Sequence, residues 1–105
     1  MNELNIIGKA LGDLELKQSE NGTKYATMLL QVKKPYKNKN GEFDYDTIQM
    51  TMFNNCVEEA KDIISDGAEL LVRGHINANN YNKEGKIIYA SNIIADRINE
   101  VSNLF

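Results

Sequence analysis

The sequence lacks most of the residues that build covalent cross-links or membrane structures. Its 105 residues include a single cysteine, Cys56, which excludes an internal disulfide framework and a cysteine-based metal site. No apolar run approaches the roughly 18 residues of a membrane-spanning helix. The polar Asn2 and Glu3 follow Met1, so no signal peptide is expected either. We expect a cytoplasmic protein whose residues 1–105 form a single domain.

An excess of positive charge is also lacking. The chain has 12 Lys and Arg against 15 Asp and Glu, and a net charge of −3 argues against polyanion binding through bulk charge. The acids are concentrated, because residues 54–69 carry a net charge of −4 and the rest of the chain +1. In that remainder, "KKPYKNK" at residues 33–39 holds four lysines and no acid: Lys33, Lys34, Lys37 and Lys39.

This basic run has two interpretations. It is either the solvated tip of a hairpin or a set of contacts for phosphates, each of which adds about −0.7 to the slope of log affinity against log salt. The nearby Glu42, Asp44 and Asp46 weaken the second interpretation unless they point away.

Alternation of apolar and polar residues is the main structural signal, and it predicts five strands. They cover residues 4–16 with a bend at Gly8, then 24–33, 47–53, 68–81 and 86–95. Turns containing Gly or Pro separate them at residues 20–22, 35–44 and 82–85. The strand over 68–81 is expected to direct Leu70, Val72, Ile76 and Ala78 to one face, and Arg73, His75 and Tyr81 to the other.

Between residues 55 and 64 the apolar period becomes helical. Asn55 and Glu58 approximate a capping box, and Asp66-Gly67 ends the helix. Three strands, a helix and two strands predict an all-β protein with one helix, the five-stranded Greek-key barrel of the OB type. The helix would lie between the third and fourth strands. An α+β sandwich is the alternative.

Three stretches in this order resemble the bacterial and phage single-stranded DNA-binding protein family. "MNELNIIGKALGDLELKQSENG" resembles its M-N-x-V-x-L-I-G-R-L-x-x-D-P-E-L-R-x-T-x-x-G, and "GEFDYDTIQMTMFNNCVEEA" its G-E-…-T-D-F-I-x-x-V-x-W-x-x-x-A-E-x-A. "GAELLVRGHINANNYNKEGK" resembles its G-x-x-V-x-V-x-G-R-L-x-x-R-x-Y-x-x-x-x-G. The resemblance runs from Met1 to about Ile98, and no single motif is decisive.

The resemblance implies a face that stacks bases and follows phosphates. Tyr36, Phe53 and Tyr81 match the family's stacking aromatics, whereas another of its aromatic positions falls on Thr47. The alternation independently places Phe53 and Tyr81 on polar faces, where core packing does not explain them. His75 and Asn79 stand where the family has arginines. We expect the basic run to continue through the residues Arg73, His75, Lys83 and Lys86.

The family assembles as a homotetramer, a dimer of dimers, and the resemblance assigns the subunit contact to the first strand, at Leu4, Asn5, Ile6, Ile7 and Gly8. The family's flexible tail with an acidic tip has no counterpart in the sequence. Asn103-Leu104-Phe105 resembles only the apolar end of that tip, so recruitment of proteins through a tail is not expected.

The sequence therefore favours sequence-tolerant binding of single-stranded DNA in replication, recombination or repair. An OB module for protein interaction with little DNA affinity is the alternative, since Thr47 and the acidic balance favour it. An enzyme is not expected, because Cys56 and His75 have no spacing that pairs a nucleophile with a base. Neither a metal site nor a cofactor is indicated, as no ligand cluster or phosphate-cradling loop is present in the sequence.

Overall fold

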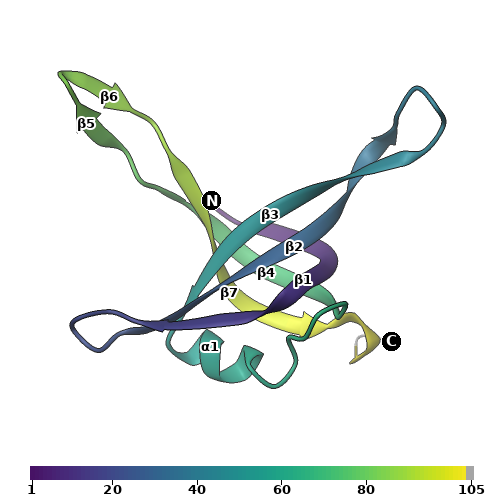
Figure 1. Cartoon of the computed structure of the whole chain (residues 1–105), viewed down its shortest axis with the longest axis horizontal. Coiled ribbons are helices and arrows are strands. Elements are labelled where there is room, and N and C mark those ends of the chain that lie inside the picture. The colour runs from purple at the N-terminus through teal and green to yellow at the C-terminus, as the bar shows by residue number, and fades with distance from the viewer. Residues whose placement is uncertain (104–105) are drawn as a thin grey trace.

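Five strands close into a barrel in the computed structural model, which describes residues 1–103 (Figure 1). Around the barrel the order is β1-β2-β3-β7-β4. The strands are β1 (Leu4–Gln18), β2 (Lys24–Lys37), β3 (Phe43–Phe53), β4 (Glu69–Ala78) and β7 (Ser91–Glu100). The helix α1 (Asn55–Ala60) lies between β3 and β4, and β5 (Tyr81–Lys83) with β6 (Lys86–Ile88) forms a separate hairpin. The predicted OB-type barrel is confirmed, and the sandwich alternative is wrong.

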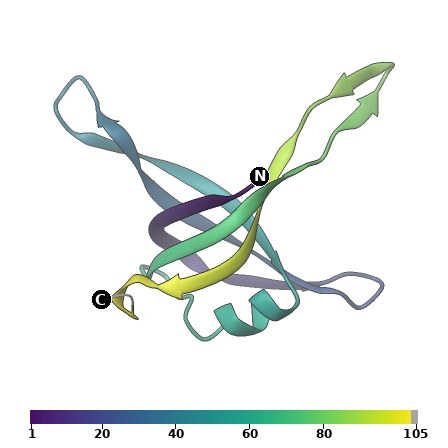
Figure 2. The same ribbon diagram turned by 180° about the vertical axis from the view of Figure 1, so that it is seen from behind.

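All pairings in the barrel are antiparallel except β3 with β7. Figure 2 shows the side on which β4 lies between β1 and β7. A short 3-10 turn, η1 (Val101–Asn103), follows β7. Of the stretch Asn103-Leu104-Phe105, the last two residues lie outside the described residues. Within residues 1–103, no helix has the length and apolar character needed to cross a membrane.

The core follows the predicted alternation. The largest fully buried side chains are Leu30, Met50, Met52, Leu70 and Val72, which come from β2, β3 and β4. Their neighbours in sequence point outward, so one face of each strand fills the barrel.

The inward prediction for Ile76 and Ala78 is wrong, because both are exposed. Here β4 has left the barrel body, and Ile76 is half exposed at 50%. The Asn2 side chain donates to the Ile76 carbonyl oxygen at 2.6 Å and accepts from the Ile76 N–H at 3.0 Å, which extends the sheet.

The β2–β3 and β5–β6 hairpins extend beyond the barrel and diverge from one another, and the β1–β2 hairpin extends in another direction (Figure 1). We call residues 33–46 the β2–β3 arm and residues 79–90 the β5–β6 arm. The predicted loop over 35–44 is shorter than expected, because β2 continues through Pro35 to Lys37. The register shifts between Lys33 and Lys37, and this irregularity accommodates a proline that has no N–H to donate. The single strand predicted over 86–95 is divided between β6 and β7, and β7 runs beyond it to Glu100.

The bend predicted at Gly8 is wrong. The β1 register with β2 instead shifts between Leu11 and Glu15, around Gly12, whose φ of +80° favours glycine. Gly8 serves a different purpose, since a Cβ there would lie 2.6 Å from the Gln31 carbonyl oxygen. Gly8 therefore permits the close approach of β1 to β2.

The capping box predicted at Asn55 is wrong. Asn54 is the N-cap residue, with φ of 49° and no side-chain hydrogen bond, and Asn55 is already helical. The helix ends at Ala60, although Ile64 beyond it is still buried. Its buried side chains close one end of the barrel: Cys56, Val57 and Ala60.

Candidate nucleic-acid interface

Phe53 lies at the end of β3 on the outer surface of the barrel. Met52 before it is fully buried, whereas Phe53 is 41% exposed, so the predicted outward direction is confirmed. Its cross-strand partner is Tyr25 on β2. The two ring centroids are 6.2 Å apart, and the ring planes are tilted by 37°. Tyr25 is partly buried, and the exposed ring of Phe53 that packs beside it suits an unpaired base.

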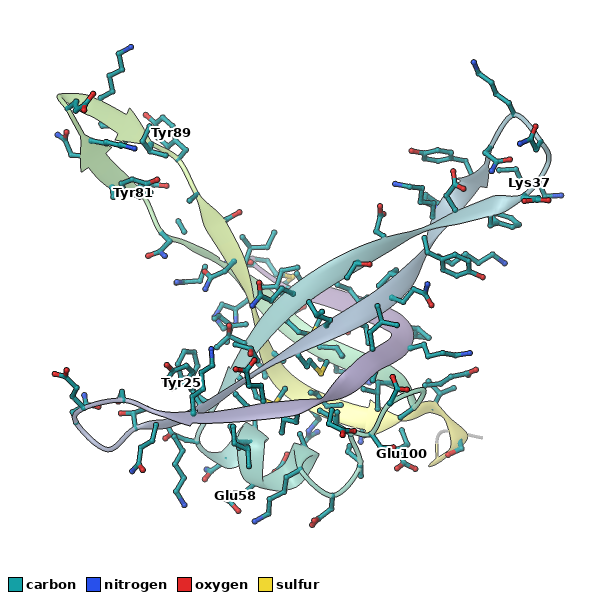
Figure 3. All side chains as sticks on the ribbon, viewed as in Figure 1. Tyr25, Lys37, Glu58, Tyr81, Tyr89 and Glu100 are labelled. Atoms are coloured by element: carbon teal, nitrogen blue, oxygen red, sulfur yellow. The ribbon has the colours of Figure 1, made fainter. Side chains whose placement is uncertain are left out.

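Tyr81 begins β5 and lies on the β5–β6 arm rather than on a continuation of β4. It is 53% exposed and is opposite Ile88. Lys83 and Lys86 are paired across the tip of the same arm. Figure 3 shows Tyr81 together with Tyr89, which is 78% exposed, on this arm. The arm thus combines exposed aromatic rings with two lysines.

The β2–β3 arm carries the basic run. Tyr36 is 65% exposed and belongs to β2, not to a loop. Lys34 forms an ion pair with Asp46, and this hydrogen bond is the main reason that the pKa of Lys34 is raised. Among the described residues, no carboxylate lies within ion-pair distance of the other lysines of the run: Lys33, Lys37 and Lys39.

Arg73 and His75 occupy the outer face of β4, as predicted. His75 is engaged by the carboxylate of Asp96, with 2.7 Å between Nδ1 and Oδ2. Asp96 is the extra residue where the β4–β7 register shifts, because Arg73 pairs with Arg97 and Gly74 with Ala95. Asp96 also lines a hollow together with Phe53. The residue that contacts His75 therefore also borders the hollow at Phe53.

The predicted site residues thus form three groups, one on the barrel and one on each arm. Figure 3 shows Lys37 and Tyr81 on the two arms, while Glu58 lies near α1 at the other end of the molecule. Lys61 and Lys24 hold Glu58, and the hydrogen bond from Lys61 is the main cause of its lowered pKa. The helical part of the acidic segment is therefore separated from the arms, whereas Glu69 at its end lines a hollow with Lys33.

Sequence reasoning missed several exposed residues beside these groups. Arg97 lies directly across from Arg73 on the neighbouring strand. Tyr45 is 54% exposed on β3, two residues before Thr47. Both signals were present in the sequence. The alternation of β3 extends back to Phe43, and the strand that carries Arg97 extends beyond residue 95.

The N-terminal part of β1 has one unoccupied edge. Leu4, Ile6 and Gly8 belong to a segment that pairs with β4, and β2 joins β1 only from Lys9 onward. Ile7 in this segment is 58% exposed. An unpaired strand edge with an exposed isoleucine is a surface on which another strand can pair.

Cys56 is 8% exposed and lies at the start of α1. Burial is the main cause that raises the pKa of its thiol to about 11, and Glu59 and Asp96 add to the effect. It is therefore protonated at neutral pH and unsuited to act as a nucleophile. Within residues 1–103, no three His, Cys, Asp or Glu side chains are grouped so that they would hold a metal ion.

Comparison with known proteins gives consistent matches. The model of the "Single-strand binding protein family" matches residues 1–101. "Single-stranded DNA-binding protein 2" of Staphylococcus aureus (strain Mu50 / ATCC 700699) is 29% identical over 99 residues, 93% of this chain and 70% of the relative. "Single-stranded DNA-binding protein 1" of that strain is 31% identical, and this chain spans 64% of its length.

The fold has the same kind of neighbour. The structure of the wild-type single-stranded DNA binding protein from Thermus aquaticus superposes with a TM-score of 0.79 at 14% identity. The superposition covers 96% of this chain and 50% of the Thermus chain, so this chain spans about half the length of that neighbour. The barrel, its two arms and the match over residues 1–101 lead to one assignment: this chain belongs to the single-strand binding protein family.

Proposed function

We propose that this chain binds single-stranded DNA, as the names of its relatives state for them, and that it does so with little sequence preference. The function is binding rather than catalysis. Bases would stack on Phe53 of the barrel and on Tyr81 of the β5–β6 arm. Phosphates would meet most of the basic residues of the predicted site, namely Lys33, Lys37, Lys39, Arg73, Lys83 and Lys86, whereas Lys34 is paired with Asp46. His75 would contact the same strand from β4.

One observation carries this proposal. Tyr81 stands 53% exposed on a projecting arm whose tip holds Lys83 and Lys86, and no carboxylate of the described residues pairs with either lysine. An exposed ring beside uncompensated positive charge offers both contacts that a single strand needs. A protein-interaction module would not require this combination.

The test is a titration of dye-labelled oligo-dT, followed by fluorescence anisotropy at low and at high salt. We expect micromolar or tighter binding that weakens steeply with salt, because counterions leave each contacted phosphate. Tyr81→Ala should weaken binding by about 1–3 kcal/mol, the contribution of one base stack. Tyr81→Phe keeps the ring and should bind nearly as well.

Double-stranded DNA of the same length is the control ligand, and we expect weaker binding to it. The absence of oligo-dT binding at low salt, with the circular dichroism of the folded protein intact, would contradict the proposal. That result would favour the alternative function, an OB module for protein interaction.

The finer features of the function are also proposals. We propose that the chain coats single strands in replication, recombination or repair. We also propose a cytoplasmic location. We further propose a homo-oligomer, a tetramer built as a dimer of dimers, in which the Leu4–Gly8 segment meets its copy through the unpaired edge of β1 and the exposed Ile7. Several weak sites on one strand then act together through their effective concentration.

A further inference from the structure

The two faces of the β2–β3 arm differ in charge. Side chains of an antiparallel pair that lie opposite one another share a face, and Lys33 is opposite Tyr45 while Lys37 is opposite Phe43. The Lys33 ammonium lies 3.9 Å from the centroid of the Phe43 ring and that of Lys37 lies 5.7 Å from it. These four residues therefore form one surface, which we call the outer face of the arm. None of them is acidic.

Asp44 and Asp46, the acids of the arm that belong to β3, lie on its other face. Asp46 is opposite Val32 and forms an ion pair with Lys34. Asp44 lies two residues before Asp46 on β3 and therefore on the same side, where it accepts a hydrogen bond from Asn38. The raised pKa of Lys34 has its largest cause in the Asp46 hydrogen bond, with Tyr36 and Asp44 among the smaller causes. Lys34 thus lies near two carboxylates, and Tyr36 lies near Lys34.

The outer face continues without interruption onto the barrel. The outward residues of β3 after Tyr45 are Thr47, Gln49, Thr51 and Phe53. The β2 residues opposite Tyr45 and these four are, in the same order, Lys33, Gln31, Leu29, Thr27 and Tyr25. Leu29 is half exposed. Tyr45 and Phe53 are about 27 Å apart along β3 at roughly 3.4 Å per residue. Between its ends the surface carries no charged side chain. Aromatic rings lie at both ends, and two lysines lie at the end on the arm.

Acids border this surface but do not lie on it. Glu15 on β1 is opposite Thr27 and pairs with Lys17 at 3.7 Å. A hollow of about 240 Å³ beside Tyr45 is lined by Lys33 and also by Glu69, which is opposite Lys9. Glu15 and Glu69 thus each have a lysine beside them, whereas Asp13, which lines a hollow with Thr27 and Gln49, accepts a hydrogen bond from the Asp66 N–H.

We propose that Tyr45 stacks a base on the outer face of the β2–β3 arm, in place of an aromatic ring at Thr47. Lys33 and Lys37, positioned over Phe43, contact the adjacent phosphates. Lys34 is neutralised by Asp46 and contributes little. This inference depends on the proposed DNA binding and adds to it a residue and a direction, because the strand follows one face of the arm. Cation–π contacts hold the two ammonium groups on that face.

The experiment compares Tyr45→Ala with Tyr36→Ala in the oligo-dT titration. Both rings are exposed tyrosines on the same arm, so each variant serves as the control for the other. Tyr45→Ala should weaken binding about 5- to 150-fold, the range that follows from one lost base stack. Tyr36→Ala should change the affinity less than threefold, and Tyr45→Phe should restore it.

The charges give a second measurement. Lys33→Gln or Lys37→Gln should each reduce the salt slope by about 0.7, the value for one contact on a single strand. The double variant Lys34→Gln/Asp46→Asn keeps the net charge and should leave the slope unchanged. Circular dichroism and sedimentation velocity confirm that the variants keep the fold and the oligomeric state of the native protein.

The outcomes separate the two proposals. If native protein does not bind oligo-dT, the proposed function fails and this inference fails with it. If native protein binds, but Tyr36→Ala weakens binding while Tyr45→Ala does not, only the choice of face is wrong. A change in oligomeric state on Tyr45→Ala would also overturn the inference, because it would assign Tyr45 to a subunit contact.

Discussion

Cys56 is a single thiol buried beneath the first turn of α1, and its pKa is raised from 9.0 to about 11. The unfolded chain therefore loses the thiol proton at lower pH than the folded protein. Below pH 9 both states are protonated, and stability does not depend on this group. Above pH 9 the thiol of the unfolded chain ionises first, so the free energy of unfolding falls with rising pH until the folded thiol also ionises near pH 11.

We expect the unfolding free energy of the native protein to fall by roughly 2 kcal/mol between pH 8 and pH 10.5 through this group, at about 1.36 kcal/mol per pKa unit. Urea unfolding at both pH values measures it. Cys56→Ala is the control, because tyrosine and lysine titrations are common to both proteins. The variant will be less stable at every pH, so the comparison is between the two pH dependences. Parallel curves would contradict the assigned pKa.

Single residues were predictable where alternation was complete. Phe53 was correctly placed outward because Met50 and Met52 define the inner face of β3. Tyr45 is not predictable in the same way, because turn signals predict a loop over 35–44 and Asp44 and Asp46 interrupt the apolar alternation of β3 on either side of it. The pairing of Lys34 with Asp46 depends on the register shift after Lys33, which no local pattern specifies.

At the scale of elements, the β5–β6 arm is attached to the barrel by a closed base. Ala78 and Ser91 are its last paired barrel residues, and the Asn79 N–H donates to the Ala90 carbonyl oxygen at 2.7 Å. The Ala90 N–H in turn donates to the Asn80 side chain at 3.3 Å. None of the buried hydrophobic side chains among the described residues comes from residues 79–90. The arm is thus an addition to a barrel that is complete without it.

Replacing residues 80–89 by Asn-Gly should therefore leave the barrel folded while weakening DNA binding. We expect the melting temperature to change by no more than about 4–8 °C, equivalent to about 1 kcal/mol for a domain of this size. Oligo-dT affinity should fall by more than in Tyr81→Ala, because Lys83 and Lys86 are lost as well. Lys83→Gln/Lys86→Gln separates the loss of charge from the loss of the ring. Loss of cooperative melting would show that the arm is part of the folding unit.

The elements themselves followed from the sequence better than their ends did. The division between β4 and β5 was missed because the same alternation continues through Asn79 and Asn80, although the strand leaves the barrel there. The capping box at Asn55 failed because the chain enters α1 through a left-handed Asn54, a conformation set by the end of β3. Tertiary constraints of this kind have no local signature.

At the scale of the whole molecule, net charge is a poor guide to partners. The concentration of acids in residues 54–69 was visible in the sequence, and Glu58 does lie far from the arms (Figure 3). The divergence of the two arms was not predictable, because it depends on where β2, β3 and the β4–β7 pair leave the barrel. The sequence thus indicated which residues are basic but not which surface they share.

The proposed assembly gives a prediction at this scale. Ile7→Lys should shift the native oligomer toward smaller species in sedimentation velocity, because a buried ammonium would replace an apolar contact at the β1 edge. Ile87→Lys is the matched control, since Ile7 and Ile87 are each 58% exposed and Ile87 lies on the β5–β6 arm. Equal behaviour of the two variants, or a monomeric native protein, would rule out the contact at Leu4–Gly8.

The closure of the barrel also governs when the protein can fold. Within residues 1–103, the start of β1 forms a ladder with β4 alone, in which Leu4 pairs with Gly74. Strand β4 pairs in turn with β7 as far as Glu100. A chain emerging from the ribosome must therefore hold its first strand incomplete until almost all of the domain has been made. Contacts between such distant residues make folding slow, in the range of milliseconds to seconds. During that interval both edges of Leu4–Gly8 are exposed, the edge that later pairs with β4 and the edge proposed to join two finished subunits, so the segment is open to premature pairing on either side.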